Sequence, residues 1–299
     1  MVKGRSRKIT ISLAGLAVVC LFLLGIIYWQ ERQDKNLRVI FFDVGQGDSV
    51  LIRTPSRQNI LIDGGPDTTL LSKLGRSLPF YDHTIDLMVL THAHADHLDG
   101  LIPVLERYDV QQVLYNGVQT AAADFTAWQD LIQDKHISTT IARAGQSFQF
   151  GTTMLEVLYP FEDVSNQAFN DLNDSSVVTK LKYQNTTFLF TGDAPVGVEE
   201  EMLDFYCQAE ARASADPCEL ESDVLKVGHH GSRYSTSEEF LEAVNPQYAV
   251  ISAGEGNQFG HPHRQTLVRL QQVGATVLRT DEVGNIGFVS DGYRVWPIK

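Results

Sequence analysis

Short apolar runs with the composition of β-strands recur along most of the chain and alternate with segments of helical periodicity. The first strand-like runs are Arg38 to Asp43, Ser49 to Arg53 and Asn59 to Asp63. The helical pattern then covers Leu98 to Arg107 and Phe125 to Lys135, and the same scheme repeats after Gly151. Strands flanked by helices in two successive halves predict an α/β fold of two sheets packed face to face, with the helices outside.

The N-terminal segment has a different pattern. Four basic residues precede Ile9 to Tyr28, a run of 20 residues without a charge, which is long enough to cross a bilayer as a helix. Tyr28 and Trp29 stand where interfacial aromatic residues belong, and no small-residue cleavage motif precedes them. We therefore predict a basic cytoplasmic tail at residues 1–8, a transmembrane signal anchor at 9–29, a linker at 30–36 and an extracytoplasmic domain at 37–299.

Composition and charge restrict what this domain can bind. The chain is 43% hydrophobic and 20% charged over 299 residues, so it can bury a substantial core. The formal net charge is −13, and the outward domain without the basic tail carries about −17. Such an acidic excess opposes tight, sequence-independent binding of duplex DNA, so any contact with nucleic acid must be local.

Seven of the nine histidines fall in three short segments that follow predicted strands. These segments are Thr91 to Gly100 with His92, His94, Asp96 and His97, Asp223 to Ser232 with His229 and His230, and Phe259 to His263 with His261 and His263. The first segment places four imidazole or carboxylate groups within six residues, directly after an apolar run. Such a cluster is costly unless metal ions bind it, so the chain is predicted to hold metal here.

The spacing within the first segment indicates two metal ions. His92 and His94 project to the same side where the pleat of the strand persists, whereas the ligands after them lie beyond the bend. A dinuclear centre needs a carboxylate between the ions, and the best candidate is Asp193 at the end of the apolar run from Phe188. Two divalent ions roughly 3.5–4 Å apart activate a water molecule, so hydrolysis is the expected reaction.

Seven short motifs follow one another through residues 37–299. They are Phe42 to Ser49, Leu61 to Gly65, Thr91 to Gly100, Asn173 to Ser176, Thr191 to Asp193, Lys226 to Ser232 and Gly260 to His263. In this order they resemble the metallo-β-lactamase superfamily, and within it the C-terminal hydrolase domain of ComEC-type competence proteins from bacterial DNA uptake. The resemblance implies a four-layer αββα sandwich with the metals at one edge, but it does not supply the substrate, because the superfamily hosts many chemistries.

The resemblance also implies a set of metal ligands. The first ion would bind His92 and His94, the second would bind Asp96, His97 and His229, and Asp193 would bridge the two. His229 is preferred to His230 because it directly follows the strand and Gly228, which leaves His230 free to contact substrate or protonate a leaving group. Asp96 and Asp193 would also orient the nucleophile in catalysis.

Residues outside this ligand set carry further expectations. Asp63 matches an acid that supports the histidine segment, and Asn173 stands where many members of the superfamily have another histidine. An amide is a weak, neutral donor, so Mn²⁺ becomes as plausible a cofactor as Zn²⁺. The candidates for substrate binding are Lys226, Ser232, Arg233, His261 and His263, with Arg264 nearby and both histidines as possible general acids.

We therefore expect a membrane-anchored hydrolase with two divalent ions that cleaves phosphodiesters, as a phosphodiesterase or nuclease acting on extracellular DNA or nucleotide-like substrates. The alternatives are a β-lactamase or lactonase, which would use a more histidine-rich first site, and a non-catalytic DNA-binding module of an uptake system. An outward domain meets an oxidising compartment, so Cys207 and Cys218 are expected to form a disulfide around an Ala-rich insertion. Cys20 should stay free in the membrane.

Overall fold

The computed structural model describes residues 15–22, 25, 35–207 and 218–298. The chain divides between Asn36 and Leu37 into two units, and all strands described below belong to the larger one. Residues 15–22 are helical, whereas the predicted tail at 1–8 and much of the predicted anchor at 9–29 lie outside the described residues. Within the described part of the chain, no helix is long and apolar enough to cross a membrane.

The first sheet contains eight strands in the order β17-β16-β1-β2-β3-β5-β7-β8. Their bounds are β1 Leu37–Phe41, β2 Val50–Arg53, β3 Asn59–Ile62, β5 Leu87–Leu90, β7 Gln112–Tyr115, β8 Ser138–Ile141, β16 Ile286–Ser290 and β17 Val295–Ile298. Strands β3, β5, β7 and β8 are parallel neighbours. A separate two-stranded sheet pairs β4 (Thr84–Ile85) with β6 (Asp109–Val110).

The second sheet contains seven strands in the order β15-β14-β13-β12-β11-β10-β9. Their bounds are β9 Ser147–Phe150, β10 Thr153–Tyr159, β11 Val178–Tyr183, β12 Thr186–Phe190, β13 Val224–Lys226, β14 Tyr248–Ile251 and β15 Thr276–Arg279. Strands β12 to β15 run parallel. Each sheet therefore has a parallel part whose carboxyl ends open onto one edge, which is where α/β folds place ligands.

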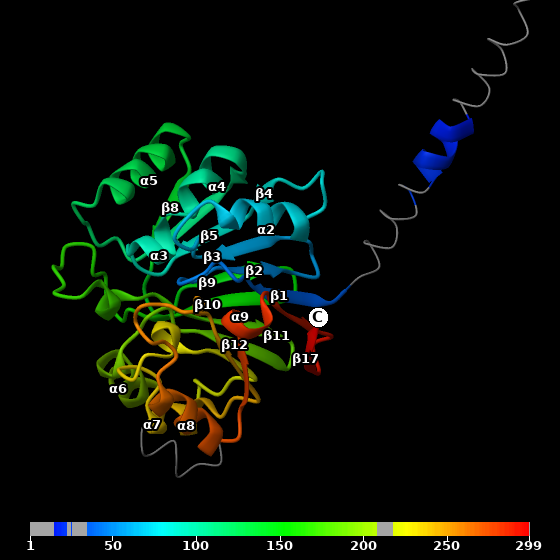
Figure 1. The fold of residues 1–299 in the computed structure, drawn as a ribbon. Helices are drawn as coiled ribbons and strands as arrows, with labels where there is room; N and C mark the ends of the chain where they lie inside the picture. The colour runs from blue at the N-terminus through cyan, green and yellow to red at the C-terminus, as the bar shows by residue number, and fades with distance from the viewer. Residues whose placement is uncertain (1–14, 23–24, 26–34, 208–217, 299) are drawn as a thin grey trace, which may run out of the picture. The chain divides into compact units, whose positions relative to one another are not determined.

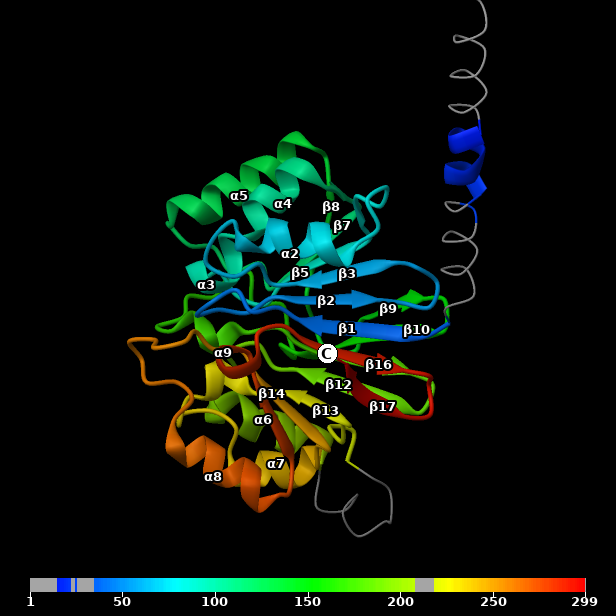
Figure 2. The same cartoon turned by 45° about the vertical axis from the view of Figure 1, so that its right-hand side comes forward.

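Helices cover the outer face of each sheet (Figures 1 and 2). The first sheet is covered by α2 (Thr69–Ser77), α4 (Leu101–Arg107) and α5 (Ala123–Asp134), and the second by α6 (Val196–Tyr206), α7 (Glu238–Val244) and α8 (Arg264–Gln272). Short helices complete the fold: α3 Ala95–Leu98, α9 Thr280–Val283 and the 3₁₀ turns η1 Leu172–Ser175 and η2 Gly228–Gly231. This arrangement confirms the predicted α/β sandwich of two sheets between helical layers.

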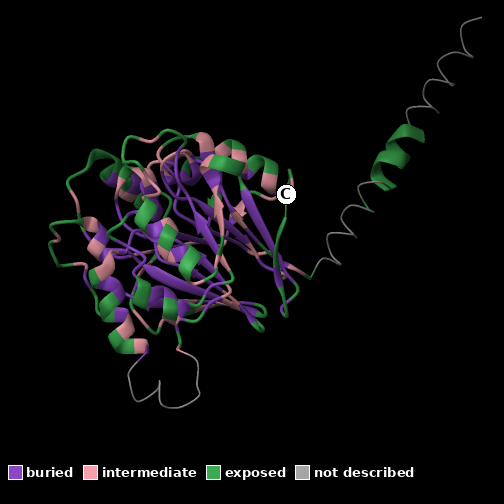
Figure 3. Cartoon of the chain, turned by 60° about the horizontal axis from the view of Figure 1, so that its bottom comes forward, coloured by how far each residue is buried: buried purple, intermediate pink, exposed green. Residues whose placement is uncertain are grey.

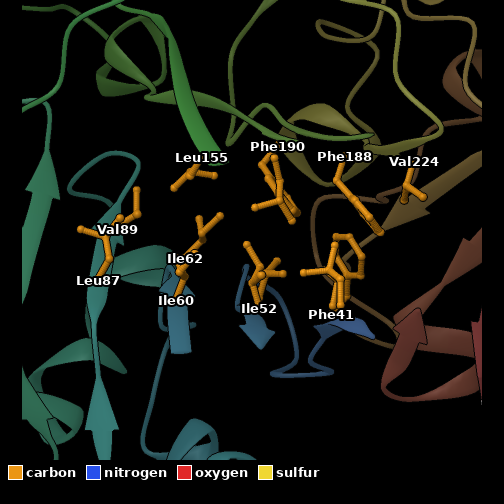
Figure 4. Packing of buried hydrophobic residues seen from close by; sticks show 14 of the residues in the cluster. Phe41, Ile52, Ile60, Ile62, Leu87, Val89, Leu155, Phe188, Phe190 and Val224 are labelled. Atoms are coloured by element: carbon orange, nitrogen blue, oxygen red, sulfur yellow. The ribbon is translucent and has the colours of Figure 1, made fainter. Parts of the chain in front are cut away.

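Three hydrophobic clusters hold these layers together. The central cluster lies between the sheets, where Ile52, Ile60 and Ile62 of the first sheet face Phe188 and Phe190 of the second (Figure 4). The other two clusters lie between each sheet and its helices. Figure 3 shows the same distribution, with buried residues in the sheets and exposed residues on the outer helical faces. Strands buried on both faces explain the continuous apolar runs in the sequence.

Local signals in the sequence fix where helix α7 begins and ends. The helix starts at Glu238 because the Ser237 side chain accepts a hydrogen bond from the backbone N–H of Phe240. At the other end, Asn245 adopts a left-handed conformation with φ 47°, which is a common way to end a helix. The helix packs Phe240 and Leu241 against the second sheet.

The structure also pairs Cys207 with Cys218, as predicted. Cys207 follows the last turn of α6, and the two Cα atoms of the disulfide are 5.1 Å apart. The Ala-rich insertion between the two cysteines lies outside the described residues.

Candidate metal centre

Three strand ends bring the candidate ligands to one place. Strand β5 leads into the segment with His92 and His97, β12 leads into Asp193, and β13 leads into His229 and His230. All three strands belong to the parallel parts of their sheets. The carboxyl ends of the parallel strands of both sheets meet here. Residues that are more than 100 positions apart in sequence, such as Asp96 and His230, therefore become neighbours.

His97 is held by one ring nitrogen and presents the other. Its Nδ1 lies 2.8 Å from Oδ2 of Asp63, a carboxylate that also accepts hydrogen bonds from the N–H and Oγ1 of Thr91, both at 2.8 Å. Nε2 of His97 is buried without a hydrogen-bond partner in the described part of the chain and lies 3.4 Å from Oδ2 of Asp193. An imidazole fixed through Nδ1 by a carboxylate is the usual arrangement of a histidine that binds metal through Nε2.

His92 and His94 form a second pair of donors beside His97. Nε2 of His92 lies 3.0 Å from Nδ1 of His94, and the rings of His92 and His97 have centroids 4.2 Å apart. Burial and the neighbouring His97 hold the pKa of His92 well below its ordinary value. Neutral imidazole is the form that binds metal, so His92 is prepared for that role.

Asp193 lies at the centre of the cluster. Its Oδ2 is 3.4 Å from Nε2 of His97 and 3.4 Å from Nε2 of His230, while its Oδ1 faces Nζ of Lys226 at 3.5 Å. Burial raises the pKa of Asp193, but His230, His97 and Lys226 together lower it by more, so the pKa lies well below its ordinary value. Asp193 therefore presents an ionised oxygen to imidazoles from both sheets.

His229 and His230 take different positions from those that the sequence suggested. Nδ1 of His230 lies 2.9 Å from the carbonyl oxygen of Ser252 and must donate to it, which leaves Nε2 to face Oδ2 of Asp96 at 3.2 Å. His230 is buried, whereas the His229 side chain is 28% exposed and its Nε2 is 3.9 Å from Asp193. The structure thus gives the position facing Asp96 to His230 rather than to His229.

The backbone at this turn is in a sparsely populated conformation. Both histidines have positive φ, 47° for His229 and 53° for His230, and Asp63 has φ 58°. Non-glycine residues in the left-handed region carry a conformational cost and concentrate at functional sites. Here the left-handed turn directs two consecutive imidazoles toward the centre.

The described residues contain four groups of three side chains whose ligand atoms lie within 4.8 Å of one another. These groups are His92, His97 and Asp193; Asp96, His97 and His230; Asp48, Asp63 and His97; and Asp48, Asp193 and His230. His229 is in none of them, and His94 joins the site through its contact with His92. The nitrogen and carboxylate donors present here are those that zinc and manganese accept in proteins.

Sequence analysis missed Asp48, which follows the Gly45 to Gly47 turn. Asp48 is buried and forms a short ion pair with Nζ of Lys226. Its Oδ1 accepts no hydrogen bond from the residues that the structure describes and lies 3.4 Å from Nδ1 of His230. Gly47 is required beside it, because a Cβ there would collide with the carbonyl oxygen of Asp96. Asp48 lies within the motif Phe42 to Ser49 that contributes to the family resemblance, but an acidic residue directly after a glycine turn does not by itself indicate a role in the site.

The charges of the centre are unbalanced without cations. Four carboxylates (Asp48, Asp63, Asp96 and Asp193) face one ammonium group, that of Lys226. Burial lowers the pKa of His230, but Asp193 and Asp48 raise it to about 10, and Asp193 and Asp63 likewise raise the pKa of His97. The carboxylates therefore favour positive charge on both imidazoles, and bound metal ions would supply that charge in place of protons.

The remaining predicted residues divide by burial. Lys226 is only 2% exposed and Ser232 is also buried, so neither presents a side chain at the surface, and their role in substrate binding stays a prediction. Nζ of Lys226 instead donates to the carbonyl oxygen of Gly192 at 2.8 Å. Arg233 is exposed, and His261 is half-buried near the centre.

Asn173 and His263 lie on segments that border the centre. Oδ1 of Asn173 is buried without a hydrogen-bond partner in the described part of the chain. Ser176, three residues later, accepts a hydrogen bond from the N–H of Asp193 at 3.2 Å and lies 3.5 Å from Nδ1 of His92. Nδ1 of His263 accepts a hydrogen bond from the N–H of Arg233 at 3.2 Å, so this contact joins the segment of His263 to the turn that follows His230. Arg264 is exposed at the start of α8.

Comparison with known proteins shows the same fold and motifs elsewhere. The family model described as "Metallo-beta-lactamase superfamily" matches residues 42–255. The chain is 29% identical to "ComE operon protein 3" of Bacillus subtilis over 96% of this chain and 37% of that protein, and 30% identical to "Competence protein ComA" of Neisseria gonorrhoeae over 90% and 35%. It therefore spans about a third of the length of these curated relatives.

Solved structures share the fold at low sequence identity. The metallo-beta-lactamase fold protein YhfI of Bacillus subtilis has a TM-score of 0.53 at 13% identity. The match covers 88% of this chain and 100% of YhfI. The metallo hydrolase Igni18 of Ignicoccus hospitalis has a TM-score of 0.52 at 15% identity, with 85% and 98% covered. CmlA of Streptomyces venezuelae, a diiron β-hydroxylase, has a TM-score of 0.53 at 14% identity, and the match covers 87% of this chain and 54% of CmlA.

Proposed function

This chain belongs to the metallo-β-lactamase superfamily, and we propose that it is a hydrolase with two divalent ions that cleaves phosphodiesters in DNA or nucleotide-like molecules. One observation carries the proposal. The Asp193 carboxylate has a ligand oxygen within 4.8 Å of ligand nitrogens of His92 and His97, and its Oδ2 lies 3.4 Å from Nε2 of His230. A carboxylate that reaches a histidine of each proposed ion is what a bridging ligand requires.

The geometry supports a set of ligand roles that differs from the sequence prediction at one residue. We assign His92 and His94 to the first ion, Asp96, His97 and His230 to the second, and Asp193 to both. His230 replaces His229 because its Nδ1 is committed to the Ser252 carbonyl oxygen while Nε2 faces Asp96, which matches the way Asp63 holds His97. When bound, two such ions activate water and stabilise the charge that develops on a phosphate.

The remaining side chains position the ligands and the substrate. Asp63 and Thr91 hold His97, and Lys226 holds Oδ1 of Asp193, so that Oδ2 points to the imidazoles. His229 is the partly exposed imidazole nearest the ligands, with a centroid 5.5 Å from that of His261. We propose that His229 contacts the substrate and donates a proton to the leaving oxygen, the role that the sequence suggested for His230.

The choice of a phosphodiester over a lactam or lactone rests on the donor set and on the relatives. Asn173 offers an uncharged, buried oxygen where many members of the superfamily have histidine, which weakens the commitment of the first site to zinc and favours Mn²⁺. Relatives over most of the chain carry the names competence protein and recombination protein. Both features support a nucleic-acid substrate over a β-lactam.

We propose further that the domain is anchored in the bacterial cell membrane by residues 9–29 and lies outside the cytoplasm. The Cys207–Cys218 disulfide supports this location, because such bonds persist in oxidising compartments.

In protein isolated without reductant, neither cysteine should react with an alkylating reagent, while both should react after reduction. Removing the disulfide should destabilise the domain by about 2–3 kcal/mol. Complete alkylation of both cysteines before reduction would contradict the outward location.

Two single substitutions separate the roles of the consecutive histidines. His230→Ala should lose about one of two bound metal ions and lower kcat on a phosphodiester at least about 100-fold, because it removes a ligand. His229→Ala should retain both ions and lower kcat about 10- to 100-fold, because it removes only the proton donor. Metal analysis of the purified variants, with hydrolysis of bis(p-nitrophenyl) phosphate, measures both effects. The reverse pattern of metal loss would return the ligand role to His229.

A substrate panel tests the proposed reaction itself. The full chain with Mn²⁺ or Zn²⁺ should hydrolyse phosphodiesters much faster than phosphomonoesters, β-lactams or lactones. Preferential opening of a β-lactam or lactone would overturn the substrate class. Binding of DNA with no turnover under any of these metals would instead support the non-catalytic alternative.

A further inference from the structure

An exposed aromatic ring lies on the loop between β14 and α8, beside the candidate metal centre. Phe259 is 54% exposed, and its ring stacks on that of His261 with centroids 5.7 Å apart and an interplanar angle of 24°. His261 therefore lies against part of the phenyl ring while much of the ring remains open to solvent. An aromatic surface supported in this way is suited to stack on a flat ligand.

The ring of Phe259 ends a row of rings that begins at the ligands. His97 and His230 have centroids 5.4 Å apart at 36°, and His230 and His261 have centroids 6.2 Å apart at 33°. With the contact between His261 and Phe259, each ring of this row neighbours the next, from the buried His97 to the exposed Phe259. A planar group stacked on Phe259 would therefore lie next to the reacting phosphate rather than at a remote site.

The loop that carries this ring is held in place. The side chain of Asn257 accepts hydrogen bonds from the N–H groups of Phe259 (3.2 Å) and His261 (3.0 Å) and donates to the carbonyl oxygen of His261 at 2.6 Å. The N–H of His263 donates to the carbonyl oxygen of Gly231 at 2.9 Å, which ties the loop to the turn that carries His230. A ring fixed before binding costs little entropy when a ligand stacks on it.

The acidic charge of the chain makes such a surface necessary for a nucleic-acid substrate. A formal net charge of −13 opposes the phosphate contacts that normally provide most of the affinity for nucleic acid. Stacking on an aromatic side chain needs no positive charge and accepts any base, because every base has a π-face. Phe259 offers such a ring on the loop that is tied to the turn of His230.

We propose that Phe259, supported by His261, is a subsite that stacks on an unpaired nucleobase adjacent to the phosphodiester to be cleaved. The inference rests on the proposed function and adds to it the recognition of the base. A base inside a duplex cannot reach the ring, so the subsite favours single strands, frayed ends and mononucleotide esters over intact duplex.

Two substrates with the same leaving group test this subsite. Thymidine 5′-(p-nitrophenyl phosphate) carries a base and methyl p-nitrophenyl phosphate does not. In the full chain, Phe259→Ala should lower kcat/KM for the thymidine ester about 10- to 100-fold and leave the methyl ester within about twofold, since that substrate has no base to stack. Phe259→Trp should retain the activity on the thymidine ester. Phe80→Ala is the matched control, because Phe80 is 76% exposed on the loop after α2, and it should change neither value.

A binding measurement keeps the test independent of turnover. Phe259→Trp adds the fluorescence of one tryptophan to that of the wild type. Thymidine 5′-monophosphate should quench this added fluorescence, and methyl phosphate should not. If the wild type hydrolyses neither ester, the proposed function fails, while this quenching still decides the subsite. Equal losses on both esters in Phe259→Ala, an unchanged value for the thymidine ester, or no quenching by the nucleotide would each overturn the subsite.

Discussion

Asp193→Ala should lose at least about 1,000-fold in kcat on a phosphodiester and bind less than half of the metal that the wild type binds. The Asp193 carboxylate converges with His92 as well as with His97 and His230, and alanine leaves the ligands of the two proposed ions with no shared carboxylate. The loss should persist at saturating metal, because added ions cannot restore a bridging ligand. Steady-state hydrolysis with metal analysis of the same sample measures both quantities.

Asp99→Asn is a matched control for this prediction. Asp99 lies on the same segment as the ligands but belongs to none of the groups that converge on the centre. It should keep both metal ions and retain activity within about threefold, because it is not one of the proposed ligands. Normal turnover in metal-depleted Asp193→Ala would refute the dinuclear mechanism.

Lys226→Met should lower the free energy of unfolding of the metal-free protein by about 3–5 kcal/mol. Lys226 is buried between Asp48 and Asp193, so its removal leaves two carboxylates without their ammonium partner in the interior. The additional substitution Asp48→Asn should recover much of the loss, because it removes one of the unpaired charges. Denaturant unfolding in the presence of EDTA measures the three variants.

Lys182→Met gives the comparison for an exposed pair. Nζ of Lys182 lies 2.6 Å from Oε2 of Glu156, but its side chain is 38% exposed, so the loss should stay below about 1 kcal/mol. Strictly additive effects of Lys226→Met and Asp48→Asn would show that the two buried residues do not act as a pair.

The position of the centre was predictable because its ligands follow parallel strands. Each cluster of histidines or aspartates comes directly after an apolar run, and the carboxyl ends of parallel strands share an edge of the sheet. This reasoning placed His92, His97 and Asp193 in segments that the structure brings together. The overall sandwich followed in the same way from the alternation of strands and helices in two halves.

The sequence could not show that His230 rather than His229 faces Asp96, because this depends on backbone conformation. Both residues follow the same strand, and in an extended chain the first of them would point to the edge. The left-handed turn at both positions reverses this expectation, and the carbonyl oxygen of Ser252 then selects the ring nitrogen of His230 that faces Asp96. Ser252 directly follows strand β14 and lies 22 positions after His230, so no local pattern carries this information.

The burial of Lys226 was missed for a related reason. A lysine at the end of a short strand usually extends its ammonium group to solvent. Strand β13, however, lies inside the second sheet between β12 and β14, and the partner of Lys226 is Asp48 from the other half of the chain. The return of β16 and β17 to the edge of the first sheet was also absent from the sequence pattern, because β16 pairs with β1 across nearly the whole chain.

Metal titration of the chelated full chain tests the central claim most directly. The protein is freed of metal with EDTA, returned to chelator-free buffer and titrated with Mn²⁺ and, separately, with Zn²⁺, while hydrolysis of bis(p-nitrophenyl) phosphate is followed. Two adjacent ions acting together predict no turnover without metal and a rise in activity that ends at two equivalents per chain. Full activity in the absence of metal, or a plateau at one equivalent, would contradict a dinuclear hydrolytic centre.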